Sequence, residues 1–222
     1  SFCAPIDQDI FKPDPARRAQ ARQSLNIADD DCVVGALGTF GWQKNHGLLV
    51  KAARALAGRV PGLKFRICGN PVDADADYFE REVLDPIKAH GLGENGYVEV
   101  VRQALPPETL LNGFDIFALP SKAEGLSLVT GEAAATGLPL VCSNVGSVPD
   151  LIQDGVNGYL LGSEDPSAWA ERIEDLVSDR DRRLAFGAAS RQLARDKVGV
   201  TRCAEDHERA YRTAFSLRTR SQ

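Results

Sequence analysis

Two glutamates and a glycine in one short stretch have the types and spacing of a ligand-binding site. Glu124 and Gly125 follow an apolar, strand-like run, and Glu132 comes eight residues after Glu124 in a helix-like segment. Gly125 would let the backbone approach a ligand closely. If the helix begins near Leu126, Glu132 lies on its second turn and faces the same crevice. A carboxylate there can accept two hydrogen bonds from a vicinal diol, as an acidic residue does for ribose in dinucleotide-binding folds.

The backbone amides at the start of the same helix are candidate phosphate donors. The first N–H groups of a helix have no partner within it, and the helix dipole favours negative charge at that end. The residues whose amides would take this role are Leu126, Ser127, Leu128 and Val129. The spacing alone leaves a second interpretation open, in which Glu124 caps a loop and Glu132 is a solvated helix residue.

A glycine-rich turn that contains one lysine follows the first strand-like run. The loop GTFGWQKNHG, residues 38–47, leads into a long amphipathic segment, and Lys44 is its cation. Such a strand-to-helix turn suits a diphosphate, although it matches neither the G-x-G-x-x-G pattern nor the Walker pattern. The alternative is that Lys44 is a solvated lysine at the start of a helix.

These motifs lie in a regular alternation of short apolar runs and amphipathic segments. The alternation predicts an α/β fold, a doubly wound, Rossmann-like parallel sheet of about six strands with helices on both faces. In such sheets ligands bind at the carboxyl ends of the strands, which is where the two motifs lie. Beyond Leu161 only helical patterns follow, and these predict a C-terminal helical tail. The expected strands, short and apolar as strands buried on both faces are, span 32–37, 63–68, 97–101, 115–120, 138–143 and 158–161.

Composition excludes several classes of protein. The 222 residues are 43% hydrophobic and carry 26 Lys+Arg against 31 Asp+Glu, for a net charge of −5. This is the composition of a globular protein, and its acidic balance argues against a surface that coats nucleic acid. No apolar run approaches the ~18–20 residues of a membrane span. Because the chain begins with Ser1 and has no methionine, we expect a piece of a longer protein or a processed product.

The cysteines, the histidines and an acidic repeat give no metal signature. Five cysteines without C-x-x-C spacing favour buried thiols, and hence a reducing compartment, over a disulfide or zinc framework. The repeat at 73–77 has Tyr78 and Leu84 where a calcium loop needs Gly and Glu, so it indicates an acidic helix start. His46 lies close to Lys44, whereas His90 and His207 are expected at the surface. The five cysteines are Cys3, Cys32, Cys68, Cys142 and Cys203.

Residues 120–161, PSKAEGLSLVTGEAAATGLPLVCSNVGSVPDLIQDGVNGYLL, resemble the signature of the family 4 (group 1) retaining glycosyltransferases. Those enzymes carry two glutamates separated by seven residues, then an alanine-rich helix, G-x-P, a small-residue turn and N-G-x-L. The opening APIDQDIFKP and the closing HERAYRTAF are also similar to the family's hinge segment and final helix. The matching residues of the long signature are Glu124, Gly125, Glu132, Gly137, Pro139, Asn157, Gly158 and Leu160.

The resemblance implies the C-terminal, nucleotide-sugar-binding lobe of a two-lobed GT-B enzyme. Glu124 would be the catalytic residue beside the sugar, and Glu132 would hold the ribose. Lys44 and the amides of residues 126–129 would hold the diphosphate. The nucleoside diphosphate sugar is then a substrate, and neither a cofactor nor a metal is expected.

One position departs from the family pattern. The family's diphosphate loop carries an Arg after the Gly and a Lys five residues later; Lys44 matches the Lys, but Thr39 stands where the Arg is expected. A threonine hydroxyl donates one neutral hydrogen bond, whereas arginine gives a charged fork. Loss of a charged hydrogen bond costs on the order of 1.5–3 kcal/mol, or roughly 10- to 100-fold in affinity. Donor binding would be weaker, or compensated by the other lobe.

The resemblance also implies how the chain is organised and what its parent protein does. Residues 1–30 would form the interlobe connection with its helix, and 31–222 the donor-binding domain with C-terminal helices; the N-terminal acceptor lobe would lie outside this chain. The parent would be a hexosyl-type transferase, for example in cell-envelope polysaccharide synthesis, that uses a UDP, GDP or ADP sugar. The acceptor would be a glycan, a lipid-linked sugar or a small molecule, and the isolated chain would be inactive.

Two alternatives to this function stay open at the level of sequence. The first is a non-catalytic nucleotide-sugar-binding module, and the second is a sugar-nucleotide epimerase of the same two-lobed fold. The location expected for the enzyme is cytoplasmic, at most at the inner face of the membrane. Any peripheral membrane contact would be made by the missing lobe, and no nucleic-acid partner is expected.

Overall fold

The computed structural model describes residues 5–102, 105–162 and 164–219, and within them it shows one parallel sheet. The strand order is β3-β2-β1-β4-β5-β6, and every pairing is parallel. This confirms the predicted doubly wound α/β fold. The strands are β1 (Cys32–Leu37), β2 (Leu63–Gly69), β3 (Val98–Arg102), β4 (Ile116–Leu119), β5 (Leu140–Ser143) and β6 (Gly158–Leu161).

The centre of the sheet is β1, which is buried on both faces. Val34 pairs with Phe65 of β2 on one side and with Ile116 of β4 on the other. Successive side chains of a strand point to opposite faces, so Val33 and Val34 enter two different hydrophobic cores. This explains why the strand is a continuous apolar run rather than an alternating one.

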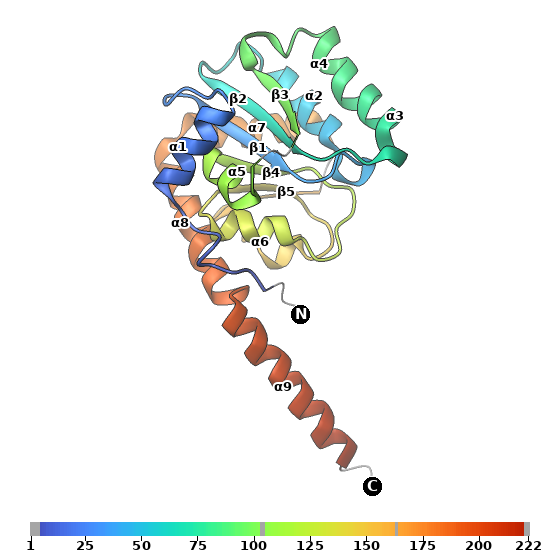
Figure 1. Cartoon of the computed structure of the whole chain (residues 1–222), viewed down its shortest axis with the longest axis vertical. Helices are drawn as coiled ribbons and strands as arrows, with labels where there is room; N and C mark the ends of the chain where they lie inside the picture. The colour runs from blue at the N-terminus through green and yellow to red at the C-terminus, as the bar shows by residue number, and fades with distance from the viewer. Residues whose placement is uncertain (1–4, 103–104, 163, 220–222) are drawn as a thin grey trace.

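Helices cover both faces of the sheet, as Figure 1 shows. One core lies beneath α2, α7 and the segment from α3 to α4, whose two helices are joined by a π-helical turn at Glu80–Leu84. The other core lies beneath α1, α5 and α6, and α8 packs against α6. The helices of the two layers are α1 (Pro15–Ser24), α2 (His46–Leu56), α3 (Ala76–Phe79), α4 (Asp85–Ala89), α5 (Pro107–Gly113), α6 (Leu128–Ala135), α7 (Pro166–Ser178) and α8 (Arg180–Lys197).

The predicted helical tail ends in α9 (Val200–Thr219), which projects away from the body of the molecule (Figure 1). Tyr211 and Phe215 are largely exposed along it. No helix within the described ranges combines the length and the apolar character that crossing a bilayer requires.

The expectation for the cysteines is wrong at one position. Cys32, Cys68 and Cys142 are free thiols, as predicted, and lie in β1, β2 and β5. Cys203, however, is disulfide-bonded, and Cys3 lies outside the described residues. A disulfide needs its two Cα atoms within about 7 Å of each other. That proximity is set by the tertiary fold, so neither the odd count nor the spacing of the cysteines could reveal it.

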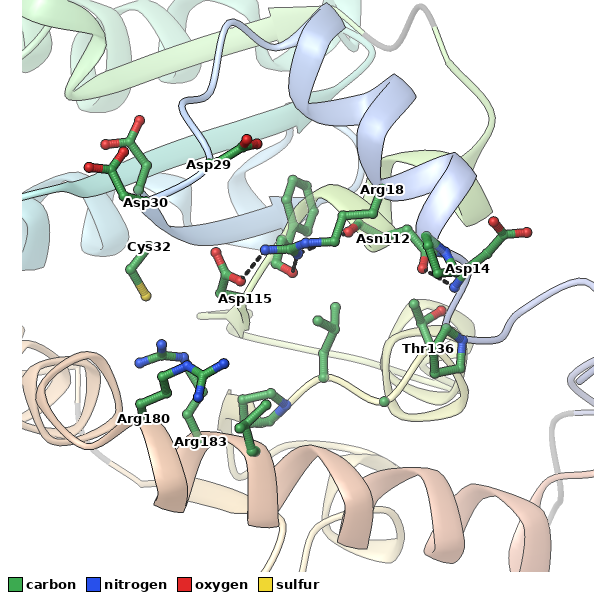
Figure 2. Close-up of a pocket in the computed structure, with 18 residues that line it drawn as sticks. Asp14, Arg18, Asp29, Asp30, Cys32, Asn112, Asp115, Thr136, Arg180 and Arg183 are labelled. Carbon is green, nitrogen blue, oxygen red and sulfur yellow. Dashed lines mark hydrogen bonds and ion pairs between the residues drawn. The ribbon is translucent and has the colours of Figure 1, made fainter.

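A carboxylate beneath the sheet ties α1 to the amino ends of the strands. Asp115 accepts hydrogen bonds from Arg18 Nη2 at 2.8 Å, from Arg22 Nη1 at 3.3 Å and from the backbone amide of Val33 at 2.9 Å. A cavity of about 610 Å³ opens beside it between α1 and α8, and Figure 2 shows Arg18 directed at Asp115 in its wall. The side chain of Arg183 in the same wall donates to carbonyls at the end of α7. These charged groups serve the packing of the helices.

We expect Asp115→Ala to lower the free energy of unfolding by about 2–3 kcal/mol, because it leaves the buried Arg22 without its carboxylate and the Val33 amide without an acceptor. Urea unfolding followed by circular dichroism measures the change. Asp30→Ala, at an exposed rim of the same cavity, should shift stability by less than about 0.5 kcal/mol. Equal midpoints for the two variants would show that the Asp115 network contributes nothing.

Candidate functional site

The two sequence motifs follow β1 and β4, the two neighbouring strands at which the strand order of the sheet reverses. The chain leaves β1 towards β2 on one side, and it leaves β4 towards β5 on the other. In open α/β sheets ligands bind outside the carboxyl ends of the strands at such a switch point. The loop after β1 carries Lys44 and the loop after β4 carries Glu124, so both lie at this edge, opposite the edge that holds Asp115.

Lys44 and Glu124 meet there in an ion pair. Lys44 Nζ lies 2.7 Å from Glu124 Oε1, and the two side chains are 20% and 8% exposed. The same carboxylate oxygen accepts a hydrogen bond from Ser121 Oγ at 2.6 Å. The sequence put these residues in separate motifs and gave Ser121 no role, although it stands three residues before Glu124. The pair places one cation and one carboxylate within reach of the same ligand.

Backbone contacts hold the loop that carries Lys44, residues 38–47, in shape; we call it the lysine loop. A Cβ on Gly69 would lie 1.7 Å from the carbonyl oxygen of Gly38, so only glycine fits where β2 ends against this loop. The Lys44 side chain packs along Gly38: a Cβ placed on Gly38 would lie 3.3 Å from Lys44 Cε. The loop after β4 is tied to it, since the Lys122 amide donates to the Gln43 carbonyl at 2.8 Å.

The loop after β5 supports Glu124 from the other side. Gly146 has φ +54°, and a Cβ there would lie 1.8 Å from the Glu124 carbonyl oxygen, so this close approach needs glycine. Next to it, the Ser147 amide donates to the Gly125 carbonyl at 3.2 Å, and Ser147 Oγ accepts from the Ser127 amide at 3.0 Å. The sequence offered only the small-residue turn SNVGS as a signal for this support.

These contacts correct the prediction for the helix start. The helix α6 begins at Leu128 rather than near Leu126. The Ser127 amide is engaged by Ser147, and the Leu128 amide donates to the Leu126 carbonyl at 3.0 Å. The prediction that all four amides are unpaired is therefore wrong for Ser127 and Leu128. The amides of Leu126 and Val129 have no hydrogen-bond partner within the described part of the chain.

Glu132 lies on the second turn of α6, as predicted, and is half-buried. Its carboxylate makes no hydrogen bond or ion pair with another described residue, and in particular none with Glu124. Burial, and to a lesser degree the Glu108 carboxylate, raise the pKa of Glu132 above its usual range. Its acceptor oxygens are therefore free of donors from the described residues.

Thr39 is exposed in the lysine loop and brings no charge to it. An anion at this edge would accordingly be held by Lys44 and by oriented amides. Trp42, in the 3₁₀ turn Trp42–Lys44, is 47% exposed beside them. In the described ranges, no three His, Cys, Asp or Glu side chains are placed to hold a metal ion. Asp73 and Asp75 lie instead in a 3₁₀ turn that leads into α3.

Comparison with known proteins identifies the family. Residues 17–193 match the model of the family described as glycosyl transferases group 1. The chain belongs to this family. The match covers well over half of the chain and includes both loops of the site.

Two curated relatives illustrate the similarity. The chain is 33% identical over 194 residues to the D-inositol 3-phosphate glycosyltransferase of Corynebacterium urealyticum, covering 85% of this chain and 45% of the relative. It is 31% identical over 198 residues to the GDP-mannose-dependent alpha-(1-6)-phosphatidylinositol monomannoside mannosyltransferase of Mycobacterium tuberculosis, covering 84% of this chain and 49% of that protein. The chain thus spans about half the length of the curated relatives that it matches.

Solved structures show the same fold. Anabaena Alr3699/HepE in complex with UDP and glucose superposes with a TM-score of 0.83 at 21% identity, over 93% of this chain and 55% of that one. The C-terminal domain of the group 1 glycosyl transferase LpcC from Francisella tularensis superposes with a TM-score of 0.76 at 22% identity, over 88% of this chain and 99% of that one. The neighbours are GT-B glycosyltransferases, so the Rossmann-like half of that fold is the architecture of this chain.

We expect Glu132→Gln to raise the free energy of unfolding at pH 7. The raised pKa of Glu132 means that the folded chain binds its proton more tightly than the unfolded chain does. Its contribution to stability is therefore full below the ordinary glutamate value, about pH 4.3, and is lost as the pH rises through the folded pKa. Urea unfolding at several pH values should show the advantage of the variant shrinking in acid.

The matched control is Glu171→Gln, which removes an exposed carboxylate on α7. It should leave stability unchanged to within about 0.5 kcal/mol at every pH. A loss of stability in Glu132→Gln at neutral pH would mean that Glu132 has a stabilising partner and is not a desolvated carboxylate.

Proposed function

We propose that this chain is the donor-binding domain of a glycosyltransferase that transfers a hexosyl group from a nucleoside diphosphate sugar with retention of configuration. The observation that carries the proposal is the pairing of Lys44 with Glu124 at the switch point of the sheet. A diphosphate needs a cation and a sugar needs a carboxylate that accepts from its hydroxyl groups, and the two lie side by side.

Each residue of the site has a distinct task in this reaction. Lys44 binds the diphosphate and neutralises the charge that develops on the leaving group, so that electrostatic stabilisation takes the place of a metal ion. The amides of Leu126 and Val129 contribute to the same anion. Glu132 accepts from the ribose hydroxyls with oxygens that no donor of the described residues occupies. Glu124 grips the sugar and stabilises positive charge at its anomeric carbon.

In the free chain the cation and the carboxylate neutralise each other. Lys44 is held by Glu124 and its side chain is only 20% exposed, so less side-chain entropy is lost when the diphosphate arrives. Binding of the donor would bring phosphate oxygens to Lys44 and sugar hydroxyls to Glu124, so that both partners exchange one contact for another. Ser121 keeps the carboxylate in place during this exchange.

Family membership supports a nucleotide sugar as the donor. One relative is named a GDP-mannose-dependent mannosyltransferase, and HepE was solved with UDP-glucose as well as with UDP and glucose. The two names carry GDP and UDP, and the proposal keeps an ADP sugar as a third candidate. Because the chain spans about half of such relatives, the proposal places the acceptor site in a second lobe of the full-length protein.

Thr39 favours one alternative, a module that binds nucleotide sugars without catalysing transfer. It stands where the family pattern has an arginine, so the loop lacks the charged fork that would share the diphosphate with Lys44. Such a module would bind nucleoside diphosphates as the transferase does. It would differ in leaving the donor sugar unreacted in the full-length protein.

Lys44→Ala should weaken the binding of nucleoside diphosphates by roughly 10- to 100-fold, because it removes a charged hydrogen bond. Isothermal titration calorimetry with UDP, GDP, ADP and their glucose or mannose conjugates measures it. Lys51→Ala is the matched control, because it removes a lysine of α2 that pairs with Glu82 at 3.1 Å on the exposed side; its affinity should equal that of the wild type. Binding of no nucleotide by the wild-type chain would refute the donor-domain proposal.

The chain by itself should transfer no sugar, since the acceptor site lies in the other lobe. Incubation with a radiolabelled sugar donor and a panel of acceptors, among them inositol phosphate and a lipid-linked sugar, tests this. The full-length protein serves as the positive control. Turnover by the 222 residues alone would contradict the proposal that the donor and acceptor sites lie in different lobes.

A further inference from the structure

The proposed function leaves unexplained a buried histidine beneath the lysine loop. His46 is the first residue of α2 and is 1% exposed. Its ring meets Phe40 and Phe79 edge-on, at centroid distances of 6.1 and 6.3 Å, and those two phenylalanines stack on each other at 4.4 Å. The imidazole is therefore held on two sides and points in one fixed direction.

That direction is toward the backbone of the loop. His46 Nε2 lies 3.2 Å from the carbonyl oxygen of Thr39. Burial lowers the pKa of His46 to about 4, and the charge of Lys44 acts in the same sense, so the ring is neutral near pH 7 and carries one N–H. A carbonyl oxygen can only accept, so the hydrogen must sit on Nε2. Nδ1 is then a bare acceptor, buried without a partner among the described residues.

This hydrogen bond completes the anchoring of the loop. The Gly38 amide donates to the Cys68 carbonyl at 3.0 Å, and the Phe40 amide donates to the Asn70 carbonyl at 2.8 Å. Both contacts tie alternate residues of the loop to the end of β2. The Thr39 carbonyl lies between them in the chain, and His46 holds it by a hydrogen bond from within the protein.

We propose that His46 is a positioning residue of the donor site, which fixes the Thr39 carbonyl through Nε2–H and so sets the loop against which Lys44 lies. The inference rests on the proposed function. A carbonyl that rotated toward the cleft would present a partial negative charge to the diphosphate. The neutral imidazole prevents this without adding a positive charge beside Lys44. The constraint matters more in this chain because Thr39 supplies no charged fork.

The positions of the two nitrogens in the His46 ring suggest a pair of variants that keeps one nitrogen position or the other. In glutamine the amide nitrogen is three bonds from Cβ, the same as Nε2 in histidine, so His46→Gln keeps a donor at the position of Nε2. In asparagine the amide nitrogen is two bonds from Cβ and matches Nδ1, so His46→Asn keeps the polarity and loses the donor to Thr39. His46→Phe removes both nitrogens and keeps a ring.

Calorimetry with UDP and with GDP, each titrated separately into the 222-residue chain, tests the proposal. We expect His46→Phe and His46→Asn to weaken binding by about 3- to 10-fold, the loss of one neutral hydrogen bond. His46→Gln should stay within about 2-fold of the wild type, because it retains the bond. Thermal unfolding of each variant, recorded in parallel, separates affinity from stability.

Tyr97→Phe is the matched control, because the Tyr97 hydroxyl donates to the Ala53 carbonyl of the same helix at 2.7 Å, away from the cleft. It should lower thermal stability without changing nucleotide affinity. If His46→Phe does not fold, the Gln and Asn variants decide the question between them. Equal affinity of these two would overturn the role of His46 while the donor domain stands. Binding of no nucleotide by the wild type would refute the proposed function, and the inference with it.

Discussion

The pairing of β1 with β4 is the constraint on which the site depends. These strands are neighbours in the sheet although some 80 residues separate them in the chain, with Val34 opposite Ile116. Because the connections leave the two strands towards opposite sides, the loops at their carboxyl ends part and leave a crevice between them. Lys44 and Glu124 join these two loops through an ion pair of 2.7 Å. The pairing of β1 with β4 thus brings the loops that carry the two residues to the same edge of the sheet.

The net charge of the chain has the same sign as the proposed ligand. The net charge is −5, yet the proposed ligand is an anion, so long-range attraction offers no help. Binding of that ligand would come from one cation and a few oriented amides at a partly desolvated site, where such contacts are stronger than in water. Glu132 adds a half-buried carboxylate whose burial costs stability in the free chain. A site that keeps such a group unpaired trades stability for readiness to bind.

Much of the site consists of residues that touch no ligand in this scheme. Gly146 lets one loop lie directly on the backbone of Glu124, and Ser147 holds Gly125 and Ser127 through hydrogen bonds. Ser121 fixes the carboxylate itself, and His46 fixes the carbonyl of the lysine loop. Each of these groups locks a rotamer or a peptide plane. In the proposed reaction this order would let one lysine and one glutamate act without a metal or a second cation.

The sequence alone determined the fold, because strands buried on both faces and amphipathic helices have different periods that survive without tertiary context. It also singled out Lys44, Glu124 and Glu132 as candidates, through their spacing and through the resemblance of residues 120–161 to a family signature. Only the tertiary structure decided which of these residues meet, that the Ser127 amide is already occupied, and that Cys203 is disulfide-bonded. These facts depend on distances between segments far apart in the chain. Local residue patterns carry no record of such distances, because strand order and loop packing set them.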